Sequence, residues 1–235
     1  MRQCAAVVFA ALATLLLSGF ASATGVVRFL GESGDYSLRI ATLKELRDLR
    51  AFRTTIRQQH DFSCGSAAVA TLLTYHYGRA VTEAEVFRVM YEQGDKDKIQ
   101  RYGFSLLDMK RYLAAAGFQA DGFEVTLDKL REARLPAIAL VRENGYNHFV
   151  VIKGVRDDKV LVGDPSSGGR IIAREDFERV WNERILFVIR NHTETAHFDV
   201  PEQWQVRLAA PLHAESMNRS GLADPTLMMR GINDF

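Results

Sequence analysis

Residues 61–77 read Asp-Phe-Ser-Cys-Gly-Ser-Ala-Ala-Val-Ala-Thr-Leu-Leu-Thr-Tyr-His-Tyr, and this stretch decides the fold. From Gly65 onward the side chains are small or apolar nearly all round, and Gly78 follows as a helix stop. A helix without a polar face must be buried on every side. We therefore predict a central buried helix whose first turn meets the preceding loop at Cys64.

The segments on either side of this helix carry signals of their own. Ahead of it, residues 26–30 and 36–40 alternate around a Gly-containing turn and predict a short hairpin, and the basic stretch 44–57 is expected to be a solvated face. Behind it, two capping-box patterns predict amphipathic helices, the second ending at Gly117. The boxes are Thr82 with Glu85 and Ser105 with Asp108.

After residue 118 the apolar period changes from that of a helix to that of a strand. Strands are expected at 118–125, 136–141, 149–155, 160–162, 171–173 and 185–189, and short helices at 127–133 and around 176–181. Helical patterns first and strand patterns afterwards indicate an α+β fold, with an N-terminal helical half packed on a C-terminal antiparallel sheet. We place this domain at 24–190 and expect 191–235 to be a loosely packed or mobile C-terminal extension.

The first 23 residues have the features of a cleavable signal peptide. Arg2 precedes an apolar run at 5–17, and Ala21-Ser22-Ala23 is a small-residue cleavage motif. The alternative is an uncleaved membrane anchor, but the run is shorter than the ~20 residues that a span needs. Cys4 stands before the apolar run, whereas the modified cysteine of a lipoprotein follows it. We expect export and a periplasmic mature protein.

The charge balance and the spacing of possible metal ligands argue against a nucleic-acid partner and a metal site. The formal net charge is +1, from 30 basic and 29 acidic residues of interspersed sign. No basic stripe recommends nucleic acid as a partner. A metal site built from His60, Cys64 and His76 would need a ligand spacing that is not a recognised set. We predict no cofactor and no metal.

Cys64 is the candidate nucleophile. The chain has two cysteines, and removal of the leader with Cys4 would leave Cys64 alone, without a disulfide partner. At the start of a helix, unpaired N–H groups and the positive end of the helix dipole stabilise a thiolate. The alternative is that Cys64 is only a small buried apolar residue.

A thiol nucleophile needs a base and a group that orients the base. His148, in Gly-Tyr-Asn-His-Phe-Val-Val, stands at the start of a predicted strand and suits the first role. Asp164 ends the next strand ahead of Pro165. If the two strands form a hairpin, the carboxylate can approach the imidazole and fix its tautomer. Taken singly, each residue has an ordinary structural interpretation, and only the ordered set favours catalysis.

Gln58 precedes Cys64 by six residues, so its amide is a candidate to join the Cys64 N–H in stabilising an oxyanion. Gln59 is a neighbouring competitor for this role. Without the other site residues, either glutamine would be interpreted as an exposed polar side chain.

These elements together resemble a known family. Gln58, Cys64-Gly65, His148 and Asp164-Pro165 occur in the order found in the bacteriocin-processing, or double-glycine leader, peptidases, family thirty-nine of the cysteine peptidases. The resemblance covers residues 57–189 and implies a papain-like fold. It also implies Cys64 as nucleophile, His148 as base, Asp164 as orienting acid and Gln58 in the oxyanion hole.

The same resemblance implies a function. Members of this family cut after a Gly-Gly pair in a leader and are usually fused to an exporting transporter. This chain departs from them in its signal peptide, in lacking a membrane bundle and a nucleotide-binding Gly-Lys-Ser/Thr loop, and in carrying Ser63 where Asp is frequent. It is more similar to stand-alone members that serve functional-amyloid secretion.

We therefore expect a peptide or protein substrate in a secretion pathway, with secretion-system components as partners. Two alternatives stay open: a module that binds the substrate without cutting it, and transfer of the acyl group to an amine in place of water.

Overall fold

The computed structural model describes residues 25–31, 34–40, 43–143 and 145–206, which form two compact units divided between Leu49 and Arg50. The predicted signal peptide and residues 207–235 lie outside the described residues. In the first unit, β1 (Gly25–Gly31) and β2 (Gly34–Ile40) pair antiparallel, as predicted. Helix α2 (Leu43–Ala51) overlaps the basic stretch 44–57 and was not predicted, whereas the exposure of residues 46–50 agrees with the expected solvated face.

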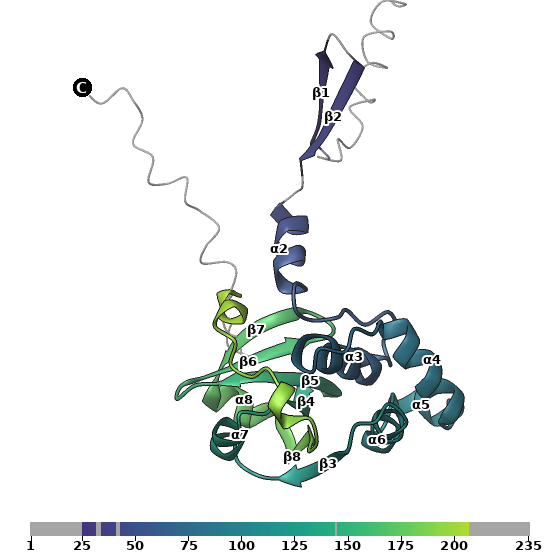
Figure 1. The fold of residues 1–235 in the computed structure, drawn as a ribbon, viewed down its shortest axis with the longest axis vertical. Helices are drawn as coiled ribbons and strands as arrows, with labels where there is room; N and C mark the ends of the chain where they lie inside the picture. Colours follow the sequence, from purple (N-terminus) through teal and green to yellow (C-terminus); the bar gives the residue numbers. More distant parts are fainter. Residues whose placement is uncertain (1–24, 32–33, 41–42, 144, 207–235) are drawn as a thin grey trace, which may run out of the picture. The chain divides into compact units, whose positions relative to one another are not determined.

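The second unit is built around α3 (Cys64–His76), the predicted central helix (Figure 1). Eleven of its thirteen residues are buried, as its composition requires. The chain leaves the helix through Gly78 at a φ of +67°, a left-handed conformation that glycine adopts without strain.

Three further helices form the helical half with α3. Both capping boxes predicted from the sequence are present, Thr82 with Glu85 and Ser105 with Asp108. One short helix was not predicted, although Asp95 caps it by accepting a hydrogen bond from the Lys98 N–H. The helices are α4 (Glu83–Gln93), α5 (Lys96–Tyr102, the unpredicted one) and α6 (Leu106–Ala115).

The second half is a six-stranded antiparallel sheet in the order β3-β8-β4-β5-β6-β7. Its strands are β3 (Ala120–Glu124), β4 (Ala137–Glu143), β5 (Tyr146–Val155), β6 (Lys159–Asp164), β7 (Gly168–Ala173) and β8 (Trp181–Ile189). Two short helices also belong to this half, α7 (Leu127–Ala133) and α8 (Arg174–Val180).

Each face of the sheet has its own apolar core. Phe149 and Val151 of β5 pack with the buried residues of α3, α4 and α6, whereas Val150 and Ile152 pack on the opposite side with residues of α7 and α8. Alternation of side chains along β5 thus places the strand at the centre of the unit, with helices on both sides (Figure 1). The predicted α+β class, with a buried helix against an antiparallel sheet, is confirmed.

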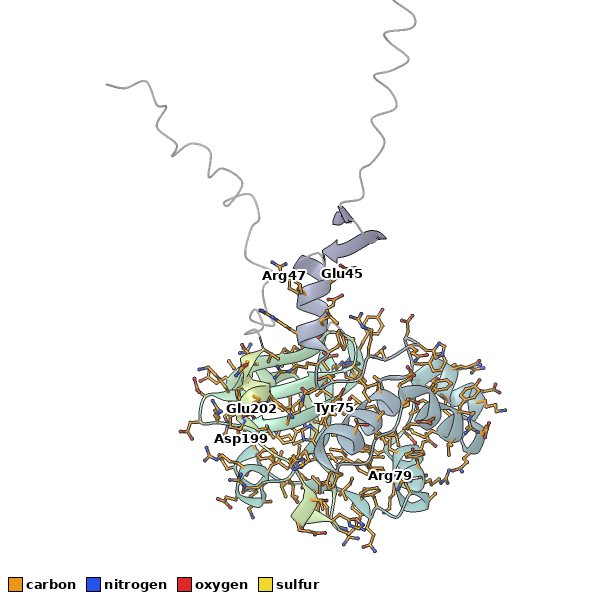
Figure 2. All side chains as sticks on the ribbon, turned by 45° about the horizontal axis from the view of Figure 1, so that its top comes forward. Glu45, Arg47, Tyr75, Arg79, Asp199 and Glu202 are labelled. Atoms are coloured by element: carbon orange, nitrogen blue, oxygen red, sulfur yellow. The ribbon has the colours of Figure 1, made fainter. Side chains whose placement is uncertain are left out.

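The described part of the predicted C-terminal extension packs on the domain. It contains two short 3₁₀ helices, η2 (Thr193–Thr195) and η3 (Pro201–Gln205). Phe198 is buried in the core on the α7 side, and the Asp199 N–H donates to the Lys153 carbonyl of β5. Figure 2 labels Asp199 and Glu202 on this segment, which lies alongside the strands.

Candidate active site

Cys64 is the first residue of α3 and is buried, with 7% of its surface exposed. Ser63 precedes the helix, but its hydroxyl donates to the His60 carbonyl and makes no capping bond to the helix. The first N–H groups of a helix have no partner within the helix. These N–H groups and the helix dipole therefore favour a negative charge on the sulfur of Cys64, the first residue of the helix.

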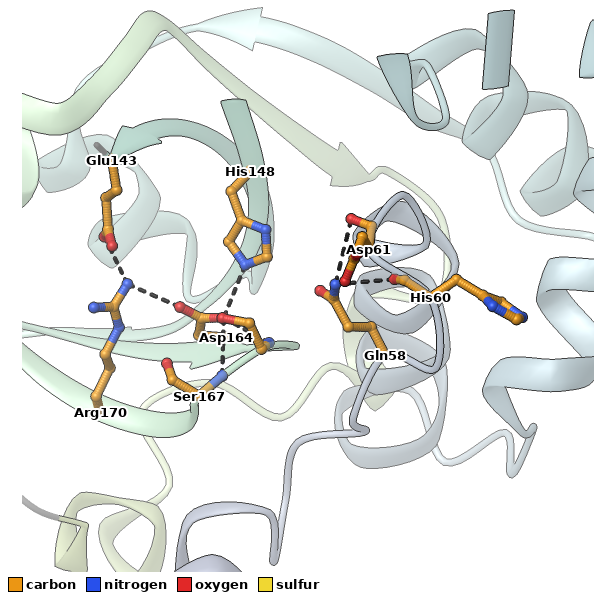
Figure 3. A network of polar contacts seen from close by, with 9 residues as sticks. Gln58, His60, Asp61, Glu143, His148, Asp164, Ser167 and Arg170 are labelled. Carbon is orange, nitrogen blue, oxygen red and sulfur yellow. Dashed lines mark hydrogen bonds and ion pairs between the residues drawn. The ribbon is translucent and has the colours of Figure 1, made fainter. Parts of the chain in front are cut away.

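The structure brings His148 and Asp164 together across β5 and β6. His148 Nε2 lies 2.8 Å from Asp164 Oδ1 (Figure 3). Val151 pairs with Gly163, so Asp164 lies one step further along β6 and His148 is within diagonal reach on β5. The hairpin on which the proximity prediction depended is present, with its turn between Val155 and Lys159.

Asp164 is 2% exposed, yet both of its oxygens are occupied. Oδ1 also accepts from the Ser166 N–H at 2.8 Å and from the Ser166 hydroxyl at 2.7 Å, and Oδ2 lies 2.9 Å from Arg170 Nη2. A buried carboxylate is tolerated only where such donors replace water. The turn after β6 therefore fixes the carboxylate before any substrate is present.

The electrostatics of this pair favour a charged imidazole. Burial opposes protonation of His148, but the hydrogen bond that its Nε2–H donates to Asp164 and the interaction with the Cys64 side chain outweigh burial and raise the His148 pKa to about 10. For Asp164, burial is likewise the largest influence and raises the pKa, but the hydrogen bond accepted from His148, the charge of His148 and the charge of Arg170 hold the pKa of the carboxyl below its usual value. Because the hydrogen bond to Asp164 uses Nε2, Nδ1 is the ring nitrogen that remains to interact with the Cys64 thiol. The arrangement can hold a thiolate, an imidazolium and a carboxylate in a row.

Gln58 lies beside the start of α3, and its backbone N–H donates to the Pro165 carbonyl at 3.0 Å. This bond joins the loop before Cys64 to the turn after Asp164. The Gln58 side-chain amide nitrogen donates to the His60 carbonyl at 3.0 Å and lies 3.5 Å from the Asp61 carbonyl (Figure 3). Gln59 is exposed.

The residues weighed as metal ligands do not form a metal site. His76 is fully buried, and burial together with the charge of Lys153 lowers its pKa to about 3. His60 instead stacks on Phe62, with ring centroids 5.6 Å apart. Among the residues that the structure describes, no group of three or more His, Cys, Asp or Glu side chains is arranged to hold a metal ion.

Three residues near the predicted site were not expected from the sequence. Ser166 and Arg170 contact the Asp164 carboxylate, and Glu143 contacts Arg170. Arg170 Nη2 lies 2.6 Å from Glu143 Oε1 as well as 2.9 Å from Asp164 Oδ2. Asp164 pairs with Gly168 across β6 and β7, so Arg170, two residues further on, is its diagonal neighbour. The sequence does place Arg170 shortly after Asp164, at Gly168-Gly169-Arg170. Its contact with Asp164 could be predicted only with knowledge of how β6 and β7 pair.

A model of the peptidase C39 family matches residues 53–193, which include all four predicted site residues. The chain belongs to the peptidase C39 family. The predicted family and the papain-like class are thereby confirmed.

Two curated relatives of this C39 chain carry the name "Probable functional amyloid protease FapD". The protein from Pseudomonas fluorescens is 40% identical over 140 residues, and that from Pseudomonas aeruginosa is 39% identical over 140 residues. Each match covers 60% of this chain and 62% of the relative, so the chain spans about three-fifths of the length of these relatives.

Among solved structures, a double glycine motif protease from an AMS/PCAT transporter, in complex with the leader peptide, is 26% identical. The match has a TM-score of 0.48 and covers 57% of this chain and 89% of the other. Within the described part of this C39 chain, no helix combines the length and the apolar content needed to cross a membrane.

Lys153 is a second buried cation of the sheet and provides an internal comparison for His148. It is 1% exposed, and its Nζ donates to the Thr54 carbonyl at 2.7 Å and to the Thr54 hydroxyl at 2.6 Å. Burial and the charge of Arg53 lower the Lys153 pKa to about 7.

His148 and Lys153 should contribute to the free energy of unfolding with opposite dependences on pH. The folded pKa of His148, about 10, is above the unfolded value of 6.5, so its stabilising contribution is complete below pH 6.5 and is lost as pH rises toward 10. Lys153 titrates near 7 when folded and at 10.5 when unfolded, so its burial cost is relieved over that interval. In urea titrations between pH 7 and 10, the free energy of unfolding should rise with pH in His148→Gln and fall in Lys153→Met. If the free energy of unfolding changes with pH in both variants as it does in the unmodified chain, the shifted pKa values assigned to His148 and Lys153 are refuted.

Proposed function

We propose that this chain is a periplasmic cysteine peptidase that cuts one peptide bond, following a Gly-Gly pair, in an exported protein. The observation that carries the proposal is the His148–Asp164 hydrogen bond of 2.8 Å beside a buried cysteine at the start of α3. Membership of the peptidase C39 family supports the same chemistry.

In the proposed reaction the Cys64 thiolate attacks the carbonyl carbon of the scissile bond. His148, as imidazolium, gives its proton to the leaving amine, and the carbon–nitrogen bond breaks to leave an acyl-enzyme at Cys64. The neutral imidazole then takes a proton from water as the water attacks the thioester, and the acid product departs with the thiolate restored. Asp164 keeps the imidazole in one tautomer and orientation throughout.

The oxyanion formed in each step would be bound by the Cys64 backbone N–H and the Gln58 amide. One Gln58 hydrogen serves the His60 carbonyl at 3.0 Å, whereas the contact with the Asp61 carbonyl is at 3.5 Å. The second distance is at the outer limit of a hydrogen bond, so that hydrogen is lost from its present partner at little cost. We propose that it turns to the oxyanion when substrate binds.

The substrate class rests on the resemblance and on the relatives. The double-glycine specificity is implied by the family, and the name of the Pseudomonas relatives associates them with functional amyloid. We propose that the substrate is a component of an extracellular fibre or of its secretion system. Export by the leader at residues 1–23 would bring the enzyme to that substrate.

Removal of the Cys64 sulfur tests hydrolysis directly. In a strain with the unmodified chain, mass spectrometry of exported proteins should detect a new terminus that follows Gly-Gly. In a strain producing Cys64→Ala, this terminus should be absent. The exposed Gln59→Ala provides a control that keeps the cut. A terminus that persists without Cys64 would contradict the proposal, and full export of uncut substrate by Cys64→Ala would favour the binding module.

The oxyanion assignment is tested by replacing the two neighbouring glutamines in turn. Gln58→Ala should lower kcat for the identified peptide by about 10²–10³-fold, the usual loss when one oxyanion donor is removed. Gln59→Ala should leave kcat unchanged because its side chain is exposed. Equal rates for Gln58→Ala and the unmodified enzyme would exclude the Gln58 amide from the oxyanion hole.

A further inference from the structure

Three charged side chains meet where the predicted catalytic row ends: Glu143 and Asp164 are the last residues of β4 and β6, and Arg170 lies on β7. Arg170 Nη2 lies between two carboxylates, 2.6 Å from Glu143 Oε1 and 2.9 Å from Asp164 Oδ2 (Figure 3). The side chain of Asp164 is 3% exposed, that of Arg170 17% and that of Glu143 25%. The cluster therefore runs from the interior toward the surface.

The two carboxylates use only part of the hydrogen-bonding capacity of the Arg170 guanidinium. Its guanidinium has five N–H donors and can bind a carboxylate with two parallel bonds. Here one nitrogen serves both carboxylates, while Nε is buried without a partner. A buried polar atom without a partner costs stability and calls for an explanation.

We propose that Arg170 is a positioning residue that holds Asp164 for His148, and that Glu143 offsets the charge of Arg170. The proposal rests on the proposed peptidase function and extends the row of Cys64, His148 and Asp164 by two members. The series then alternates in sign from the thiolate to Glu143.

The consequences of this series follow from charge balance. Arg170 occupies Oδ2, so Oδ1 stays directed at His148. A cation this near to Asp164 also opposes the charge on the imidazolium, and Glu143 reduces that opposition. The charged groups that act on His148 and Asp164 are each other, Cys64 and Arg170.

Strand pairing brings further charged and titratable groups close to His148. On β4, Val141 pairs with His148, Arg142 with Asn147, and Glu143 with Tyr146. The test must therefore change Glu143 and Arg170 while Arg142 and Tyr146 are left in place.

The test uses the full-length chain and iodoacetamide, with alkylation of Cys64 followed by peptide mass spectrometry from pH 4 to 11. The upper inflection of the alkylation rate marks the loss of the His148 proton, because the thiolate is then released from its ion pair. Glu143→Gln should move this inflection down, and Arg170→Gln should move it up, each by about half a pH unit or more. In Arg170→Gln, the Ser166 N–H and hydroxyl still donate to Asp164 Oδ1, so the carboxylate keeps part of its support.

The double variant Glu143→Gln/Arg170→Gln restores the net charge of the cluster, so its inflection should return toward that of the unmodified chain. A merely structural role predicts no such return. Shifts in the same direction, no shifts, or a double variant displaced further than either single one would overturn the proposal. If Arg170→Gln does not fold, Glu143→Gln alone decides, and an unmoved inflection refutes the proposal.

Alkylation needs no peptide substrate, so the two proposals can fail separately. Shifted inflections without any detectable cleavage would preserve the charge series and refute the peptidase. Cleavage with unmoved inflections would support the peptidase and refute the charge series.

Discussion

The packing of α3 against the centre of the sheet is the constraint on which the rest of the domain depends. Almost every side chain of α3 is buried, and Val151 of β5 lies in the same core. This packing fixes where the helix begins, and therefore where the Cys64 sulfur lies. The bond from the Gln58 N–H to the Pro165 carbonyl then joins the loop before the helix to the turn that carries Asp164.

A buried row of charges is unfavourable unless every member has a partner. Asp164 meets this condition through His148 on β5, Ser166 in the turn after β6 and Arg170 on β7. The cost of removing these groups from water is offset by their mutual contacts. The same contacts keep the carboxylate from rotating, which is what an orienting acid requires.

The features that the sequence made predictable are those encoded locally. The apolar run after Gly65, the two capping boxes and the turn after Val155 each specified their element. The ordered set of Gln58, Cys64, His148 and Asp164 predicted a candidate site, and the structure brings His148 and Asp164 of that set together. Arg170 and Glu143 escaped notice because their meeting depends on the register of β6 with β7 and on where β4 ends. Helix α5 was missed because its seven residues include only one that is buried, Ile99.

The central physical claim is that sulfur, imidazole and carboxylate share charge in one hydrogen-bonded row. Nuclear magnetic resonance of ¹⁵N-labelled histidine measures this directly through the protonation of the His148 ring. The imidazole should remain doubly protonated at pH 8 and lose its proton only near its pKa of about 10, and it should titrate at lower pH in Cys64→Ala and Asp164→Asn. A His148 ring that titrates near 6.5 in the unmodified chain, as a free histidine does, would contradict the account.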